Sequence, residues 1–142
     1  MNLYQKFIVN GAPRGKQRAR TFYNARMGKM QSITPEATKD YESLIRWSFT
    51  QAGGKYMGDK AIALHVLAVY PIPKSFSKSK RQQAEEGKMR PRVKPDVDNI
   101  AKAVLDALNG VCYADDKQVV AFSLCKIYGT EPRLEVEVLE WE

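Results

Sequence analysis

The sequence predicts one compact domain of mixed α/β (α+β) type, with a mixed sheet of about four to five strands and about two to three helices. Three observations predict it. The 142 residues are 44% hydrophobic and 27% charged, which is typical of a single globular domain with a normal core. Apolar or alternating segments of strand length are separated by Gly and Pro. Longer segments repeat apolar residues at helical spacing. The predicted domain covers residues 1–142.

The first elements are expected to be a strand, a loop and a hairpin. Residues Leu3–Val9 alternate as a strand does. The following segment, Gly11–Arg20, is a basic loop punctuated by Gly and Pro. Segments Thr21–Tyr23 and Gly28–Gln31 are compatible with a small hairpin.

A helix is predicted next. Thr34 and Pro35 are typical of a cap followed by the first helical position. The helix should reach about Ala52, because Gly53 and Gly54 follow it. Its predicted inner side carries Tyr41, Leu44, Ile45, Trp47 and Ser48.

The middle of the chain predicts a central buried strand at Ala61–Tyr70, which is nearly all apolar. We expect His65 within it to be a satisfied core histidine rather than a catalytic base. Segment Ser77–Gly87 is polar and compatible with a helix, and Met89–Pro95 is extended and basic.

The last elements are a helix and two strands. The helix is predicted at Val97–Asn109, and the strands at Val119–Tyr128 and Leu134–Val138. Glu135 and Glu137 point outward in the last strand, so one face of the sheet should be solvated there.

The helix at 97–109 is apolar over most of its circumference, with a narrow polar stripe formed by Asp98, Lys102 and Asp106. An ordinary solvent-facing stripe of charge pairs is one explanation. A stripe that lines a cleft is the explanation that we favour, because solvent-facing stripes are usually wider.

Charge is distributed unevenly along the chain. The net charge is +7, and residues 1–35 contain seven Lys or Arg and no acid. Residues 74–94 hold eight bases against two acids, whereas residues 95–142 hold ten acids against four bases. This pattern fits either an unevenly charged solvated surface or two basic segments that bind nucleic acid. The acidic region would repel DNA unless cations neutralised it, which indicates a metal site.

Two pairs of aspartates lie on either side of this helix. Taken alone, Asp96 is a good helix cap and Asp115-Asp116 a turn pair. The predicted helix is roughly 20 Å long, and an extended return from Gly110 would bring Asp116 back beside Asp96 and Asp98. Such carboxylates repel one another unless a hard cation such as Mg²⁺ or Mn²⁺ joins them.

The stretch Lys94–Val119 closely resembles the signature of the RusA family of Holliday-junction resolvases. It has an Asp-x-Asp-Asn opening, a Lys four residues after the second Asp, an Asp-Ala-Leu helix end and an Asp-Asp-x-Gln-Val turn. The basic N-terminal loop and the Thr-Pro helix start also look like those of bacterial and phage members.

The resemblance implies a RusA-like fold and a homodimeric endodeoxyribonuclease that resolves four-way junctions by paired phosphodiester cleavage in DNA recombination and repair. Mg²⁺ is the implied cofactor, with Mn²⁺ as a substitute. The family's catalytic positions fall on Asp96, Asp98, Asp116 and Lys102, with the three aspartates as metal ligands. Lys102 would hold the scissile phosphate. The alternative role for Lys102 is structural, as the cation of a salt bridge that links Asp98 and Asp106. Supporting positions would be Asn99, Asp106 and Asp115.

Basic side chains are candidates for DNA contacts, because cations bind phosphate and determine position on DNA. Those that we expect to bind are Arg14, Lys16, Arg18, Arg20, Arg26, Arg92 and Lys94.

Two other functions stay open. A non-catalytic module that binds branched DNA has no use for clustered carboxylates, whereas a metal phosphoesterase acting on flaps or RNA would use the same residues. The two cysteines, Cys112 and Cys125, lack metal-ligand spacing, and no apolar run is long enough to span a membrane. The N-terminus lacks the features of a signal peptide, so we expect a cytoplasmic protein without disulfides or a membrane partner.

Overall fold

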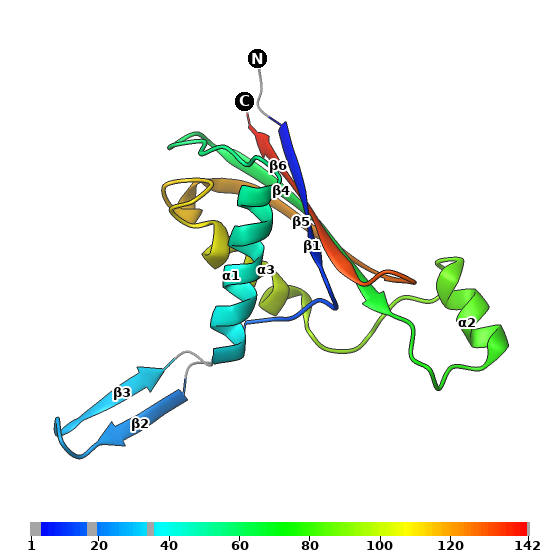
Figure 1. Cartoon of the computed structure of the whole chain (residues 1–142), viewed down its shortest axis with the longest axis horizontal. Coiled ribbons are helices and arrows are strands. Elements are labelled where there is room, and N and C mark those ends of the chain that lie inside the picture. The colour runs from blue at the N-terminus through cyan, green and yellow to red at the C-terminus, as the bar shows by residue number, and fades with distance from the viewer. Residues whose placement is uncertain (1–3, 17–19, 34–35, 142) are drawn as a thin grey trace.

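The computed structural model describes residues 4–16, 20–33 and 36–141, and in this part the chain is an α+β fold of six strands, three α-helices and one short 3₁₀ helix (Figure 1). The strands are β1 (Tyr4–Asn10), β2 (Arg20–Asn24), β3 (Lys29–Ile33), β4 (Ile62–Pro71), β5 (Val119–Gly129) and β6 (Arg133–Glu140). The helices are α1 (Glu36–Gln51), α2 (Lys78–Glu85), α3 (Val97–Leu108) and the 3₁₀ helix η1 (Asp116–Gln118). Within the described ranges, no helix combines the length and the apolar character needed to cross a bilayer.

Four strands form one mixed sheet in the order β1-β6-β4-β5. Strand β6 pairs antiparallel with both β1 and β4, whereas β4 and β5 are parallel. Parallel neighbours need a long crossover, and the chain between β4 and β5 supplies it through α2 and α3. Strands β2 and β3 form a separate hairpin. The predicted mixed sheet with a few helices is confirmed.

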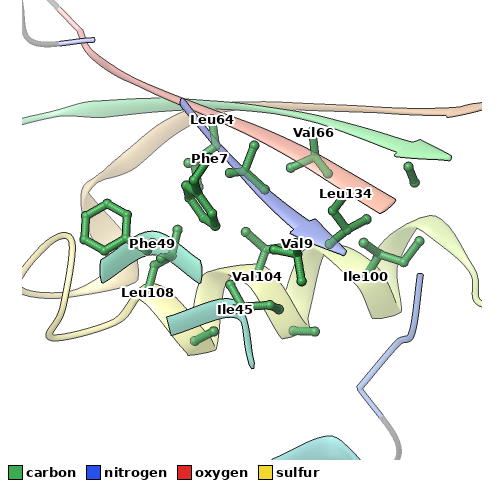
Figure 2. Packing of buried hydrophobic residues seen from close by; sticks show 14 of the residues in the cluster. Phe7, Val9, Ile45, Phe49, Leu64, Val66, Ile100, Val104, Leu108 and Leu134 are labelled. Carbon is green, nitrogen blue, oxygen red and sulfur yellow. The ribbon is translucent and has the colours of Figure 1, made fainter. Parts of the chain in front are cut away.

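Helices α1 and α3 lie side by side on the same side of the sheet (Figure 1). The core fills the space between them and the sheet (Figure 2). From α3, Ile100, Val104 and Leu108 are fully buried, and Phe7 packs edge to face on Phe49 with ring centroids 5.5 Å apart. Each such side chain contributes about 1.5–3 kcal/mol on burial, so the core holds α3 firmly in place.

The buried side of α1 differs from the one that we predicted. Tyr41, Ile45 and Ser48 are buried as expected, but Trp47 is 60% exposed and Leu44 is 37% exposed. The remaining buried positions are Thr38 and Phe49. The stripe therefore runs at alternating spacings of three and four residues, which places Trp47 on the opposite side of the helix.

The predicted central buried strand is found at β4, where seven of the ten residues are buried, but the expected burial of His65 is wrong. Strand β4 is central, but His65 is exposed, and its Nδ1 lies 2.6 Å from the Ser123 hydroxyl on β5. Because both long helices lie on one side of the sheet, the residues that alternate with the core positions face the other side. His65 is thus a surface residue with a hydroxyl partner, and not a core histidine.

Candidate active site

A cleft of about 1250 Å³ runs along α3 and collects most of the polar residues that the sequence singled out. The predicted polar stripe of Asp98, Lys102 and Asp106 lies on its wall, so the stripe lines a cleft as we expected. The remaining lining comes from the loop after β1, the first turn of α1, α3 itself and the segments on either side of α3: Pro13, Arg14, Gly15, Lys16, Ala37, Lys94, Pro95, Asp96, Asn99, Leu105 and Asp116.

Asp96 occupies the N-cap position of α3 without acting as a cap. Its backbone is extended, as an N-cap requires, but its side chain makes no capping hydrogen bond. The carboxylate is exposed and lines the cleft. The capping explanation, which sequence reasoning favoured for Asp96 alone, does not account for this side chain, and its oxygens are available to a ligand.

Tyr70 anchors the backbone before Asp96. Its hydroxyl donates a 2.5 Å hydrogen bond to the carbonyl oxygen of Pro95. Burial, with a smaller contribution from the Asp96 charge, raises the pKa of Tyr70 to about 12, so the hydroxyl keeps its proton and remains a donor at neutral pH. This positioning residue was missed because Tyr70 lies 25 residues from Pro95 and belongs to an apolar strand.

The segment before α3 is also tied to β5. The Lys126 ammonium donates to the Val93 carbonyl oxygen at 2.8 Å and lies 4.9 Å from the centre of the Tyr70 ring. Arg90 donates to the carbonyl oxygen of Lys126 at 3.2 Å. These bonds hold residues 90–93 against the sheet and so position Lys94 and Asp96 at the cleft.

Lys102 presents an exposed ammonium group to the cleft. Within the described residues it forms no ion pair, so the salt bridge considered from Asp98 through Lys102 to Asp106 is not the arrangement found. Asp98, also exposed, lies in the first turn of α3, where the helix dipole favours negative charge.

Lys16, and not Lys102, forms the ion pair with Asp106. Its ammonium group donates a short hydrogen bond to the Asp106 carboxylate and lies 3.7 Å from Glu42 Oε1. The hydrogen bond with Asp106 is the main reason that the pKa of Lys16 is raised. Lys16 was predicted as a DNA contact, and in the structure its ammonium group is paired with Asp106 inside the cleft.

The loop that carries Lys16 packs closely on the start of α3. The Lys16 backbone N–H donates to the Asn99 carbonyl oxygen at 2.9 Å. A Cβ on Gly15 would lie 2.7 Å from the Asn99 Cβ, so only glycine allows this approach. Asn99 therefore supports the site through its backbone, which holds the loop.

Asp115 and Asp116 have different roles. The Asp115 carboxylate accepts from the Lys117 N–H, and the Gln118 side chain accepts from the Asp115 N–H at 2.8 Å, which completes a capping box. Gln118 also donates to the carbonyl oxygens of Gly58 and Lys60. Asp115 thus builds the turn that presents Asp116. The Asp-x-x-Gln spacing was a readable signal for this box, and we missed it.

The environment separates the pKa values of these two carboxyls. The backbone N–H of Lys117 is the main cause of a lowered pKa at Asp115. A hydrogen bond shared with Asp115, followed by desolvation, raises the pKa of Asp116, and the charge of Asp106 adds to this. Asp116 therefore lies in a field of negative charge that a bound cation would relieve.

The predicted extended return from Gly110 to Asp116 is wrong. The chain turns tightly at the end of α3, because the N–H groups of Val111 and Cys112 both donate to the Leu108 carbonyl oxygen. The buried Tyr113 hydroxyl then donates to the Leu105 carbonyl oxygen at 2.6 Å. These turn hydrogen bonds satisfy backbone groups that an extended chain would leave unpaired.

The cleft carries the donor atoms that a hard divalent cation needs, but the donors are too far apart to bind one ion together. Asp96, Asp98 and Asp116 offer only carboxylate oxygens, the donors that Mg²⁺ prefers. Among the described residues, however, no three His, Cys, Asp or Glu side chains are close enough together to hold one ion. The donor set fits, and side-chain movement would be needed to close it around a cation.

The remaining predicted DNA contacts lie at the cleft or beyond its rim. Arg14 and Lys94 are exposed and line the cleft. Arg92 is exposed next to it, and Arg26 is exposed at the turn of the β2–β3 hairpin. Arg20 begins β2, and Arg18 lies outside the described residues.

The similarity of this chain to known proteins covers all of the segments that form the cleft. The family model described as Endodeoxyribonuclease RusA matches residues 10–139. A Bacillus subtilis (strain 168) protein, named uncharacterized protein YqaN, is 38% identical over 137 residues, which cover 95% of each chain. The matched family region contains every residue of the cleft, from Pro13 to Asp116.

Proposed function

This chain belongs to the Endodeoxyribonuclease RusA family, and from that premise we propose that it resolves Holliday junctions by paired cleavage of phosphodiester bonds in DNA recombination and repair. The observation that carries the proposal is the cleft, in which Asp96, Asp98 and Asp116 lie together with the exposed ammonium group of Lys102. A protein that only binds DNA gains nothing from carboxylates that repel phosphate.

The three aspartates would hold Mg²⁺, or Mn²⁺ as a substitute. The absence of a capping bond at Asp96 and the raised pKa of Asp116 support this assignment, since both observations describe carboxylates whose charge the neighbouring groups do not compensate. A bound cation would supply an activated water and neutralise the charge that develops on the phosphate. Asp106 is paired with Lys16, so it supports the site and is not assigned as a ligand.

Lys102 would hold the scissile phosphate. Its ammonium group is exposed in the cleft one turn along α3 from Asp98, which places a positive charge beside the carboxylates. Held there, it stabilises the additional negative charge of the transition state. Arg14 and Lys94 lie on the same cleft and would bind neighbouring phosphates. Arg92 and Arg26 would contact DNA outside the cleft, and we propose Arg20 and Arg18 as further DNA contacts.

Paired cleavage requires two sites. A four-way junction has two-fold symmetry, and a homodimer with one cleft in each subunit matches it. We therefore propose that the protein acts as a homodimer, and that it works in the cytoplasm, where chromosomal and phage DNA are both accessible.

The test is direct. The purified protein is incubated with Mg²⁺ and a synthetic four-way junction, a flap or a linear duplex. We expect symmetric nicks on the junction that DNA ligase can reseal. Equal cutting of the flap or the linear duplex would overturn the junction assignment in favour of a general phosphoesterase. Tight junction binding without cutting in either Mg²⁺ or Mn²⁺ would identify a binding module instead.

A further inference from the structure

The β2–β3 hairpin projects from the body of the protein (Figure 1). Its side-chain hydrogen bonds, among the residues that the structure describes, all join hairpin residues to one another. Asn24 shapes the turn by accepting from the N–H groups of Arg26 and Met27, and Gly28 supplies the positive φ of 64°. The hairpin is thus an internally ordered arm.

This arm exposes large apolar side chains. Tyr23 is 63% exposed and stands directly opposite Met30, which is 60% exposed, in the strand register. Met27 at the turn is 53% exposed, and Phe22 on the other face is 38% exposed. A two-stranded hairpin has no core of its own to bury such groups. Exposed apolar side chains gathered on one projection mark a binding surface.

The charge of the arm identifies the kind of partner. The sequence of the arm contains Arg20, Arg26 and Lys29, and residues 1–35 contain no acid. Cations interleaved with aromatic and thioether side chains match single-stranded nucleic acid, in which phosphates bind the cations and bases stack on the rings. A purely apolar protein partner would leave the positive charges without compensation.

The arm begins next to the cleft. Lys16 lies in the cleft and Arg20 starts β2, so four residue steps separate them. Four steps reach at most about 14 Å. On the other side, α1 begins at Glu36, three residues after the end of β3 at Ile33, and Ala37 lines the cleft. Both ends of the arm are therefore close to the bond that would be cut.

We propose that the β2–β3 hairpin binds bases whose stacking is interrupted at the branch point, with Tyr23 stacking on a base and Met30 packing beside it. The inference rests on the proposed function, because a branch point is where a junction presents bases that are not stacked in a duplex. It assigns the recognition of branching to the hairpin, while the cleft performs the hydrolysis.

The experiment uses the full chain in EDTA, where no cutting occurs, and a four-way junction with 2-aminopurine at the branch point. Stacking on Tyr23 quenches the probe. We expect Tyr23→Ala to restore its fluorescence and to weaken junction binding by roughly tenfold, with duplex binding nearly unchanged. Met30→Ala should have a smaller effect in the same direction. Tyr23→Trp should keep the quenching, because it keeps the ring.

Tyr56→Ala is the matched control, since Tyr56 is 58% exposed and lies elsewhere on the chain. The proposal is overturned if Tyr23→Ala behaves like this control, or if Tyr23→Ala changes the sedimentation of the free protein, which would indicate a protein contact. Cutting is measured separately in Mg²⁺. Failure of the wild-type protein to cut would overturn the proposed hydrolysis and leave the quenching result to decide the role of the hairpin.

Discussion

Lys16 is the residue on which the electrostatics of the cleft depend most. Its ammonium group compensates Asp106 and approaches Glu42, which come from two different helices. Without it, two carboxylates would face each other across a partly buried gap. Lys16 therefore ties α1 to α3 and leaves Lys102 as a cation available to a substrate.

We expect Lys16→Met to destabilise the protein by about 1 kcal/mol, because the pair is only partly shielded from solvent. In a double mutant with Asp106→Asn, part of this loss should be recovered, since the unpaired carboxylate is removed as well. Urea unfolding of the two single mutants and the double mutant measures the coupling. Strictly additive losses would show that the two side chains do not stabilise each other.

The metal assignment is tested at Asp98. We expect Mg²⁺ to raise the Tm of the wild-type protein, because a ligand that binds only the folded state stabilises it. In Asp98→Asn this shift should shrink and cutting should fall to background, while junction binding in EDTA persists. Differential scanning fluorimetry, a junction-cleavage assay in Mg²⁺ and a gel-shift assay in EDTA give the three measurements. An unchanged Mg²⁺ shift together with full cutting would remove Asp98 from the site.

Individual cleft residues differed in how far the sequence could predict them. Asp98, Lys102 and Asp106 were predictable, because helical periodicity alone places them on one stripe. The bond between Lys16 and Asp106 joins positions 90 residues apart, so no local pattern encodes it. It depends on how the loop after β1 packs on α3, which only the folded chain determines.

At the scale of elements, the short helix η1 determines where Asp116 lies. The Gln118 side chain makes three hydrogen bonds, to the Asp115 N–H and to the carbonyl oxygens of Gly58 and Lys60. The turn is thereby attached to the segment before β4. The predicted extended return failed because it considered only the length of the chain and not the hydrogen-bonding needs of the groups at the end of α3.

Gln118→Ala should therefore lower kcat more than it weakens junction binding. The change removes the anchors of the turn while leaving Asp116 in place in the sequence, so Asp116 loses its fixed orientation. We expect a loss of roughly 0.5–1.5 kcal/mol in stability, because the hydrogen bonds removed are partly buried or exposed. Gln118→Glu is a useful companion, because it keeps the acceptor for Asp115 and removes the donors. An equal decrease in binding and kcat for Gln118→Ala would contradict a positioning role.

Across the whole molecule, elements with strong local signals were predicted well. The apolar run at β4 and the amphipathic pattern of α3 gave their positions to within one or two residues. Sheet order and the side that the helices cover depend on contacts between distant segments, so the exposure of His65 was not predictable from its apolar neighbours. The prediction of the buried side of α1 was wrong for the same reason, since Trp47 is apolar but lies on the exposed side of the helix.

The distribution of charge over the molecule leads to the last prediction. The hairpin residues and the exposed Arg92 do not line the acidic cleft, so DNA would contact these cations around the cleft and meet the carboxylates only at the cut site. Binding should then weaken steeply with salt, because each phosphate that a cation neutralises releases counterions. Reversing Arg26 and Arg92 to Glu should lower the slope of log K against log salt by roughly one for each phosphate that is no longer neutralised. Lys55→Glu, beyond the far end of α1, makes the same charge change away from the cleft and should leave the slope nearly unchanged. Equal effects of all three reversals in a salt titration would mean that net charge, and not the position of these residues, governs binding.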